Sequence, residues 1–154
     1  MIVSMNINGE SKTATIGGFE SLLRVLRDDL GLLGSKNACE QGECGSCSVI
    51  LDGENVCACL VMAADCEGSE ITTVEAYGQE GDLHPFQQAM LDEHGVQCGF
   101  CTPGIVVTGI RLLEENPTPS EDEIREALSG NICRCTGYGG ILRAFERLAQ
   151  DGEE

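Results

Sequence analysis

The sequence predicts an α+β protein, with a β-rich N-terminal domain that grips one helix and a C-terminal four-helix bundle. In the first half, the turn signals Asn8-Gly9 and Asp52-Gly53 each separate two alternating apolar segments, as in β-hairpins. Beyond residue 84, the segments carry helix start and stop signals instead. The polar residues between them predict domains at 1–76 and 84–154, joined by a linker at 77–83.

The N-terminal domain is predicted to contain two hairpins, a helix and a final short strand. In chain order, these elements are expected at residues 2–7, 11–16, 20–30, 48–60 and 70–75. The helix has leucines at helical spacing on one face, namely Leu22, Leu23, Leu26 and Leu30. We therefore expect a small mixed sheet that packs on this leucine face.

The C-terminal domain is predicted to contain four helices. Proline near a helix start, the capping box of Ser120 with Glu123, and glycines beyond the ends, such as Gly95, delimit them. The predicted helices run from Pro85 to about Glu93, from Thr102 to about Glu115, from Ser120 to Gly130, and over 139–150. Four short helices of this kind form a bundle.

Composition and charge exclude several classes of function. The net charge is −17, from 26 acidic and 9 basic residues, so the surface repels nucleic acid and anionic lipid. No apolar run approaches the roughly 20 residues of a membrane span. The first ten residues have neither a basic region nor an apolar core typical of a secretory signal. We therefore expect a cytoplasmic protein.

The chain contains ten cysteines, which form either disulfides or metal sites. Without export the thiols stay reduced, so their clustering favours metal. The first group has the spacing Cys39-x4-Cys44-x2-Cys47, with Cys59 further on, as in plant-type 2Fe–2S sites. Interspersed glycines relieve crowding around a cluster and let backbone N–H groups point at sulfur. Zinc fits the four-residue gap poorly.

The second group consists of two close pairs, Cys98 with Cys101 and Cys133 with Cys135. Two such pairs can hold zinc, but the single residue between Cys133 and Cys135 disfavours a regular zinc knuckle. Both pairs precede predicted helices, whose N-termini favour thiolates and an anionic cluster. The sequence therefore favours a second iron–sulfur site and leaves a structural zinc module as the alternative.

The remaining candidates for chemistry have simpler interpretations. Cys57 is expected to be a small buried apolar residue, although it is the one rival of Cys59 as fourth ligand. Cys66 is expected to be structural. His84 and His94 lie near helix ends, where they act as caps or surface residues. With no hydrolytic constellation or dinucleotide motif, the chain is expected to carry electrons without a substrate site of its own.

Three motifs, "CEQGECGSC", "VQCGFCTPG" and "GNICRCTGYGGI", follow one another in this order. With them the chain resembles, over residues 2–149, the iron–sulfur subunit of the molybdenum hydroxylases. The resemblance implies a plant-ferredoxin-like β-grasp domain followed by a four-helix domain. It also implies an outer 2Fe–2S cluster on Cys39, Cys44, Cys47 and Cys59, and an inner one on Cys98, Cys101, Cys133 and Cys135.

The resemblance further implies partners and a direction of electron flow. Electrons would pass from a molybdenum–pterin cofactor on a large subunit through the inner and outer clusters to FAD on a medium subunit, in a dimer of heterotrimers. Gln97 and Cys135 match positions that contact the pterin, whereas the position of Cys57 is usually not a cysteine. The first loop resembles the purine and xanthine branch more than the carbon monoxide branch. Carbon monoxide, nicotinate and aldehyde dehydrogenases are alternatives.

Overall fold

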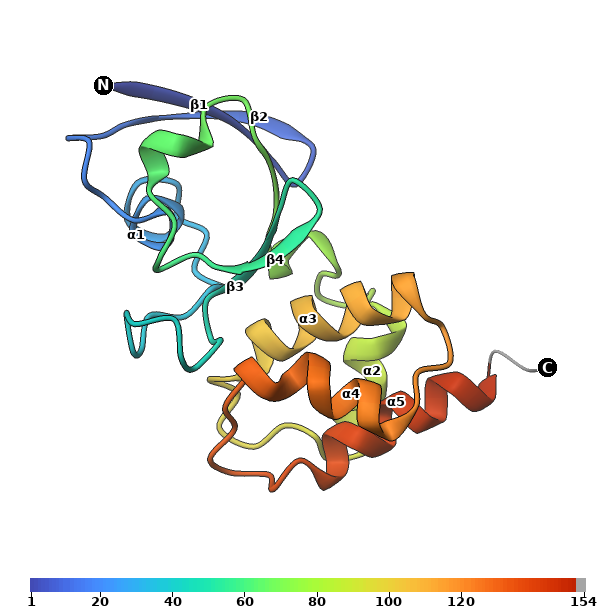
Figure 1. Cartoon of the computed structure of the whole chain (residues 1–154). Helices are drawn as coiled ribbons and strands as arrows, with labels where there is room; N and C mark the ends of the chain where they lie inside the picture. Colours follow the sequence, from blue (N-terminus) through green and yellow to red (C-terminus); the bar gives the residue numbers. More distant parts are fainter. Residues whose placement is uncertain (152–154) are drawn as a thin grey trace.

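The computed structural model describes residues 1–151 and contains a sheet-bearing N-terminal half and a helical C-terminal half (Figure 1). The α+β class predicted from the sequence is therefore confirmed. The last three residues of the predicted second domain, 152–154, lie outside the described residues. Within the described part, no helix is long and apolar enough to cross a membrane.

The N-terminal half is built on one mixed five-stranded sheet with the order β2-β1-β5-β3-β4. Strand β1 pairs with β5 in parallel, and the other neighbours pair antiparallel. The strands are β1 (Ile2–Ile7), β2 (Glu10–Thr15), β3 (Ser48–Leu51), β4 (Glu54–Cys57) and β5 (Glu70–Thr72). Both hairpins are thus confirmed.

Both hairpin turns have the backbone that their residues predict. Asn8 and Gly9 have φ values of 55° and 80°, and Asp52 and Gly53 have values of 49° and 90°. Two successive positive φ values define a type I′ turn, which matches the right-handed twist of the flanking strands. The second turn returns the chain along β4 and so carries Cys57 and Cys59 back toward the cysteine loop that precedes β3.

The predicted leucine helix is present but is not regular. Helix α1 (Leu22–Arg24) begins after Ser21 and continues as a π-helical turn, η1 (Val25–Asp29). In that turn the N–H of Leu30 donates to the carbonyl of Val25 at 3.1 Å. This wider turn puts two successive residues, Val25 and Leu26, into the core with no exposure. A strictly 3.6-residue pattern does not predict that.

The core of the N-terminal half lies between the sheet and this helix. Side chains from α1 and η1 pack on those from β1, β3 and β5, among them Val3, Met5, Ile7, Leu22, Leu26, Val49 and Ile71. Two short 3₁₀ turns, η2 (Ala63–Cys66) and η3 (Val74–Ala76), lie on either side of β5. Around the predicted linker, Gln79 and Asp82 form an isolated β-bridge.

The C-terminal half contains the four predicted helices. They are α2 (Pro85–Asp92), α3 (Thr102–Glu115), α4 (Glu121–Ala127), which continues as η4 (Leu128–Gly130), and α5 (Gly139–Asp151). Their second core includes Phe86 and Phe145, whose ring centroids lie 4.5 Å apart. The capping box of Ser120 with Glu123 is present, as predicted.

The ends of α2 show one expected cap and one difference. His84 is the N-cap: its Nδ1 accepts from the N–H of Phe86 at 3.1 Å, as the cap interpretation expects. At the other end, His94 rather than Gly95 takes the positive φ, of 57°. The N–H groups of His94 and Gly95 donate back to Leu91 and Met90, which is a Schellman motif. The stop is thus one residue earlier than predicted.

The two halves meet where α3 lies against β3 and β4 (Figure 1). Asn55 on β4 donates its side-chain amide to the hydroxyl of Thr108 on α3 at 2.8 Å. At the start of α3, a Cβ on Gly104 would approach the carbonyl oxygen of Gly45 to 2.0 Å. The two backbones therefore touch beside both groups of cysteines.

Candidate metal centres

The first cysteine group lies on the loop between η1 and β3, opposite the end of β4. Gly42 and Gly45 on this loop have φ values of 74° and 69°. A Cβ on Gly45 would lie 2.2 Å from the carbonyl oxygen of Gly130, so only glycine fits there. Cys39, Cys44 and Cys59 are half-buried and Cys47 is buried. The loop thus brings Cys47 against Cys59, which follows β4.

The loop backbone stabilises the thiolate of Cys39. The N–H of Gln41 donates to its sulfur at 3.4 Å. This bond, with further ones from the N–H groups of Cys44 and Glu43, lowers the pKa of Cys39 from 9.0 to about 6. Backbone donors aimed at sulfur are also what an anionic iron–sulfur cluster requires. The loop therefore suits a negatively charged group.

The first four thiols form two contacting pairs. Cys39 shares a hydrogen bond with Cys44. Cys47 shares one with Cys59, while burial raises the pKa of Cys47 to about 12. A thiol that is buried and protonated in this way becomes a ligand only when a metal displaces its proton.

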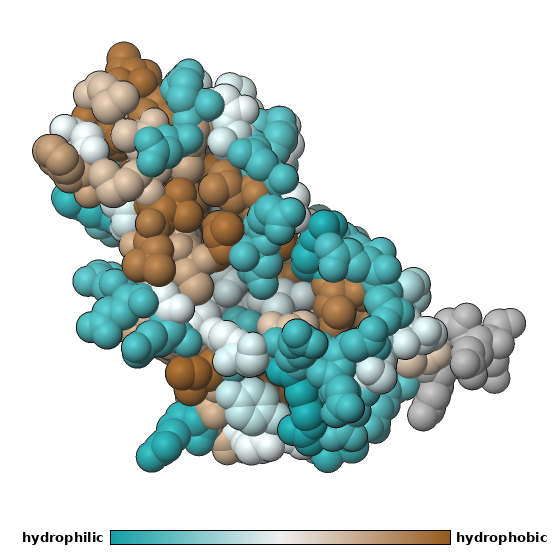
Figure 2. All heavy atoms as spheres, in the orientation of Figure 1, coloured by the Kyte–Doolittle hydropathy of each residue, from teal (hydrophilic) through white to brown (hydrophobic). Residues whose placement is uncertain are grey.

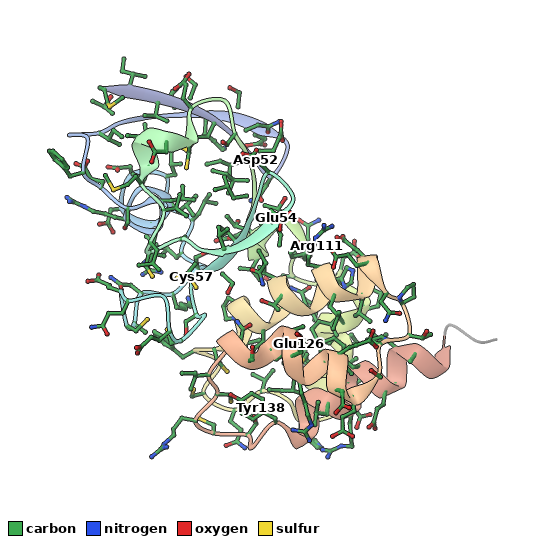
Figure 3. The ribbon with its side chains drawn as sticks, in the orientation of Figure 1. Asp52, Glu54, Cys57, Arg111, Glu126 and Tyr138 are labelled. Carbon is green, nitrogen blue, oxygen red and sulfur yellow. The ribbon has the colours of Figure 1, made fainter. Side chains whose placement is uncertain are left out.

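Cys57 lies at the end of β4 beside this group (Figure 3), and its thiol also interacts with that of Cys47. Its thiol donates to the carbonyl of Gly42 at 3.7 Å. Burial raises the pKa of Cys57, and the neighbouring thiol of Cys59 raises it further. Cys57 is therefore a protonated thiol engaged with the loop backbone.

The second cysteine group combines the turn before α3 with the segment before α5. Its thiols also pair: Cys101 shares a hydrogen bond with Cys133, and Cys98 shares one with Cys135. Burial raises the pKa of Cys101 to about 12. Cys98 and Cys135 are exposed, whereas Cys133 is buried. This group thus has an inward pair and an outward pair.

Cys133 is held by its own loop. Burial alone would raise its pKa, but hydrogen bonds from Thr136 and from the N–H of Cys135 lower it below the ordinary value. The hydroxyl of Tyr138 accepts from the N–H of Cys133 and donates to the carbonyl of Asn131, both at 2.9 Å. Tyr138 therefore fixes the chain on both sides of Ile132.

A backbone hydrogen bond connects the two cysteine loops. The N–H of Ile132 donates to the carbonyl of Cys44 at 2.9 Å. Cys44 is in the first group, and Ile132 directly precedes Cys133 of the second. Sequence reasoning did not predict this contact, because the two residues are far apart in the chain and neither carries a local signal for it.

Two further residues predicted to have a role, Gln97 and Cys66, lie in different surroundings. Gln97 is exposed and directly precedes the exposed Cys98. Cys66 is buried in the first core and its thiol donates to the carbonyl of Met62 at 3.6 Å, in keeping with a structural role.

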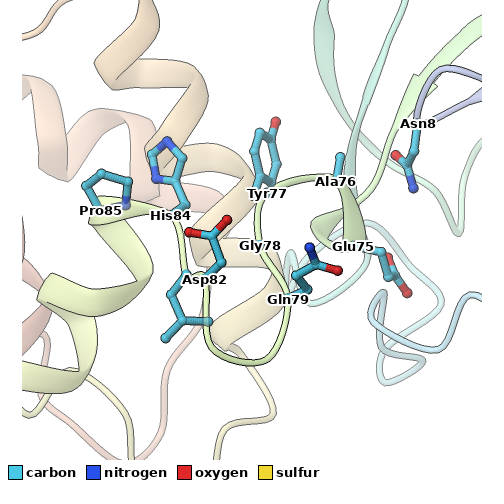
Figure 4. A pocket seen from close by; sticks show the side chains of 10 residues that line it. Asn8, Glu75, Ala76, Tyr77, Gly78, Gln79, Asp82, His84 and Pro85 are labelled. Carbon is cyan, nitrogen blue, oxygen red and sulfur yellow. The ribbon is translucent and has the colours of Figure 1, made fainter.

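A cavity of about 530 Å³ at the linker is lined by residues such as Asn8, Asp82 and His84 (Figure 4). No cysteine lines it.

The donor set fits iron–sulfur clusters better than a single ion. Within residues 1–151, no three Cys, His, Asp or Glu side chains converge on one metal position. Two pairs of thiols in each group instead match a cluster whose two irons take two thiolates each. Beside the second group, Thr102 Oγ1 is buried without a hydrogen-bond partner. Its hydroxyl is available to a group that enters there.

Comparisons with known proteins agree with this geometry. Residues 5–76 match the family described as 2Fe-2S iron-sulfur cluster binding domain, and residues 73–146 match that of the [2Fe-2S] binding domain. The chain is 43% identical to the nicotinate dehydrogenase small FeS subunit of Eubacterium barkeri, over 96% of each chain. It is 44% identical to the nicotine 6-hydroxylase small subunit of Paenarthrobacter nicotinovorans, over 92% of this chain and 86% of that one.

Solved structures give the same result. Quinoline 2-oxidoreductase from Pseudomonas putida 86 superposes with a TM-score of 0.93 at 42% identity, over 99% of this chain and 96% of that one. The chain belongs to the iron–sulfur small subunits of the molybdenum hydroxylases. It carries two 2Fe–2S clusters, since both cluster-binding domains are matched.

Family membership settles the class of protein but not its branch. This subunit is an electron-transfer component of a multi-subunit oxidoreductase. The likeness of the first cysteine loop predicted the purine and xanthine branch. A probable xanthine dehydrogenase subunit of Bacillus subtilis is 42% identical, but a caffeine dehydrogenase subunit of a Pseudomonas strain is 41% identical. Together with the nicotinate and nicotine relatives, these values do not single out xanthine.

Proposed function

We propose that this subunit relays electrons from a molybdenum–pterin centre on a large partner subunit to FAD on a medium partner subunit. When bound, each cluster supplies a one-electron acceptor and donor. The order would be the inner group, Cys98, Cys101, Cys133 and Cys135, and then the outer group, Cys39, Cys44, Cys47 and Cys59. The observation that carries the proposal is that the two groups are distinct yet touch through the backbone of Cys44 and Ile132.

The thiol contacts support an assignment of ligands to each iron. Cys39 with Cys44, and Cys47 with Cys59, would hold the two irons of the outer cluster. The corresponding pairs of the inner cluster are Cys98 with Cys135 and Cys101 with Cys133. Cys57 would remain a thiol that donates to Gly42. In each group, the chain's own role is to hold four thiolates and to aim N–H donors at them.

The exposed residues around the inner group support a molybdenum cofactor bound on that side of the subunit. Gln97, Cys98 and Cys135 are exposed around the inner group. Because Gln97 is exposed, its amide is available to hydrogen-bond a pterin on the large subunit. We propose that Gln97 and the backbone at Cys135 form this contact.

The names of the relatives support a substrate class for the large subunit. Nicotinate, nicotine, quinoline and caffeine are all nitrogen heteroaromatic compounds. We therefore propose hydroxylation of a nitrogen heteroaromatic ring, which includes purines such as xanthine. An aldehyde oxidoreductase subunit of Escherichia coli, 38% identical, makes an aldehyde the second candidate.

We also propose a domain organisation and an assembly for this subunit. Residues 1–76 would be a β-grasp domain and residues 84–154 a four-helix bundle domain, with the linker at 77–83. Helices α2 to α5 share one core, which supports the bundle. The complex would be a cytoplasmic dimer of heterotrimers without nucleic acid.

The test is a metal analysis of the purified native protein. We expect about four irons and four acid-labile sulfides per chain, with two distinct EPR signals after reduction by dithionite. Copurification of two larger chains, one with molybdenum and one with FAD, would support the partners. Zinc in place of iron, with no EPR signal, would overturn the relay.

A further inference from the structure

Asn131 occupies the junction between the two cysteine loops. It is only 4% exposed, and its side chain reaches from the segment before Cys133 to the first loop. Its Nδ2 donates to the carbonyl of Gly45 at 3.2 Å and to the hydroxyl of Ser48 at 3.3 Å. Both amide hydrogens therefore bond to the first cysteine loop and to the start of β3 that follows it.

The backbone of Asn131 is tied to the inner group at the same time. Its carbonyl accepts from Tyr138, whose hydroxyl also accepts from the N–H of Cys133. Its N–H donates to the carbonyl of Leu128 at 2.9 Å, which anchors the segment to the start of η4. One buried residue thus contacts both loops through fixed hydrogen bonds.

The surrounding packing leaves this junction little freedom. Gly45 and Gly130 are in backbone contact, and so are Gly45 and Gly104. The hydroxyl of Ser48 also donates to the carbonyl of Gly45 at 2.8 Å, so Asn131, Ser48 and Gly45 form a closed set. Hydrogen bonds among buried polar groups of this kind favour one arrangement over others.

The hydrogen bond between the two loops lies directly beside this set. The N–H of Ile132, the residue after Asn131, donates to Cys44, the residue before Gly45. Electron exchange between two centres falls steeply with their separation and depends on the bonds between them. A shift of Asn131 relative to Gly45 would therefore also displace the neighbouring backbone hydrogen bond from Ile132 to Cys44.

We propose that Asn131 is a positioning residue for electron exchange between the two clusters. It fixes the outer loop against the inner one, and so sets the separation of the clusters and holds the hydrogen bond from Ile132 to Cys44. Asn131 is not a ligand and need not touch either cluster. This inference rests on the proposed relay function.

The test compares Asn131→Leu with Asn55→Leu in the full chain with both clusters. Leucine at 131 keeps the shape but removes both donors, while Ser48 and Gly45 still satisfy each other, so folding is retained. Asn55→Leu is the matched control, because it removes another hydrogen bond between the halves, to Thr108, away from the loops. Iron content, the EPR splitting between the two reduced clusters, and the rate of electron exchange after pulse reduction are measured.

We expect Asn131→Leu to keep about four irons per chain but to change the EPR splitting and to slow electron exchange roughly tenfold. Asn55→Leu should leave both quantities as in the wild type. A wild-type splitting and rate in Asn131→Leu would overturn the inference, and so would an equal effect of Asn55→Leu.

A second variant covers poor folding of the first. If Asn131→Leu does not load iron, the same measurements are made on Ser48→Ala. This variant removes one of the two acceptors of the Asn131 amide. A smaller change in the same direction supports the inference, and no change overturns it. A wild-type protein without iron would instead refute the relay function itself, so the two failures are distinguishable.

Discussion

Two neighbouring cysteines on the returning chain, Cys57 and Cys59, differ in their hydrogen bonds. Both thiols interact with the buried thiol of Cys47, but Cys57 also donates to the carbonyl of Gly42. We expect Cys59→Ser to lose the outer cluster and so to retain about two of four irons. Cys57→Ser, the matched control, should retain all four, as measured by iron and sulfide analysis with EPR. An unchanged iron content in Cys59→Ser would show that Cys57 is the ligand.

The low pKa of Cys39 predicts selective chemistry in the apoprotein. Its pKa of about 6 makes it a thiolate at pH 7.5, whereas Cys47, at about 12, stays protonated. We expect iodoacetamide to modify Cys39 well before Cys47, with a rate that rises through a midpoint near pH 6. Peptide mapping by mass spectrometry at a series of pH values measures this. A midpoint near 9 would contradict the role of the loop N–H groups.

The lowered pKa of Cys39 also makes the stability of the apoprotein depend on pH. Because folding lowers the pKa of Cys39 from 9.0 to about 6, its ionised form stabilises the apo fold fully above pH 9. That contribution is lost as the pH falls through about 6. Cys47 and Cys101 act oppositely, because folding raises their pKa values to about 12. Their contribution is present below pH 9 and is lost as the pH rises toward 12.

At the scale of elements, the close contact of α3 with the first cysteine loop allows a packing test. Alanine at position 104 improves helix propensity by about 0.8–1.0 kcal/mol. Its Cβ would, however, lie 2.0 Å from the backbone oxygen of Gly45, which cannot move freely. We therefore expect Gly104→Ala to lower the free energy of unfolding by about 1–3 kcal/mol in urea denaturation.

A second glycine provides the control for this substitution. Gly130 has no atom within 4 Å of an added Cβ, and its φ is not positive. Gly130→Ala should therefore change the stability by no more than about 0.5 kcal/mol. Equal stability of the two variants would mean that α3 and the loop can separate without cost.

The elements differ in how far the sequence could predict them. The residues of turns and helix caps favour these conformations locally. The Asn8-Gly9 turn and the Ser120 capping box were therefore predictable from the sequence. The cysteine spacing likewise indicated two 2Fe–2S sites. The π-turn at Val25 was not predictable, because core packing rather than a local signal selects it. The contact between Asn131 and Gly45 joins residues 86 positions apart, and a single sequence does not show which distant residues meet.

At the scale of the whole molecule, exposed apolar surface is unevenly placed. Figure 2 shows hydrophobic side chains gathered over the N-terminal half and a mostly hydrophilic surface over α4 and α5. Exposed apolar residues lie next to both cysteine groups: Leu60 beside Cys59, and Ile132 beside Cys133, are 62% and 53% exposed. On a chain with a net charge of −17, we expect these two residues to lie where partners bind.

This placement predicts that each cluster loop binds a different partner. Burying a leucine or isoleucine contributes about 1.5–3 kcal/mol, which corresponds to roughly tenfold or more in affinity. We therefore expect Leu60→Asp to weaken binding of the FAD subunit by at least about tenfold and to leave the molybdenum subunit bound. Ile132→Asp should do the reverse. Titration of each variant with each separate partner measures both affinities, and each variant is the control for the other. If either substitution weakened both partners equally, the two loops would not be separate docking sites, and electrons would not enter and leave the subunit at opposite clusters.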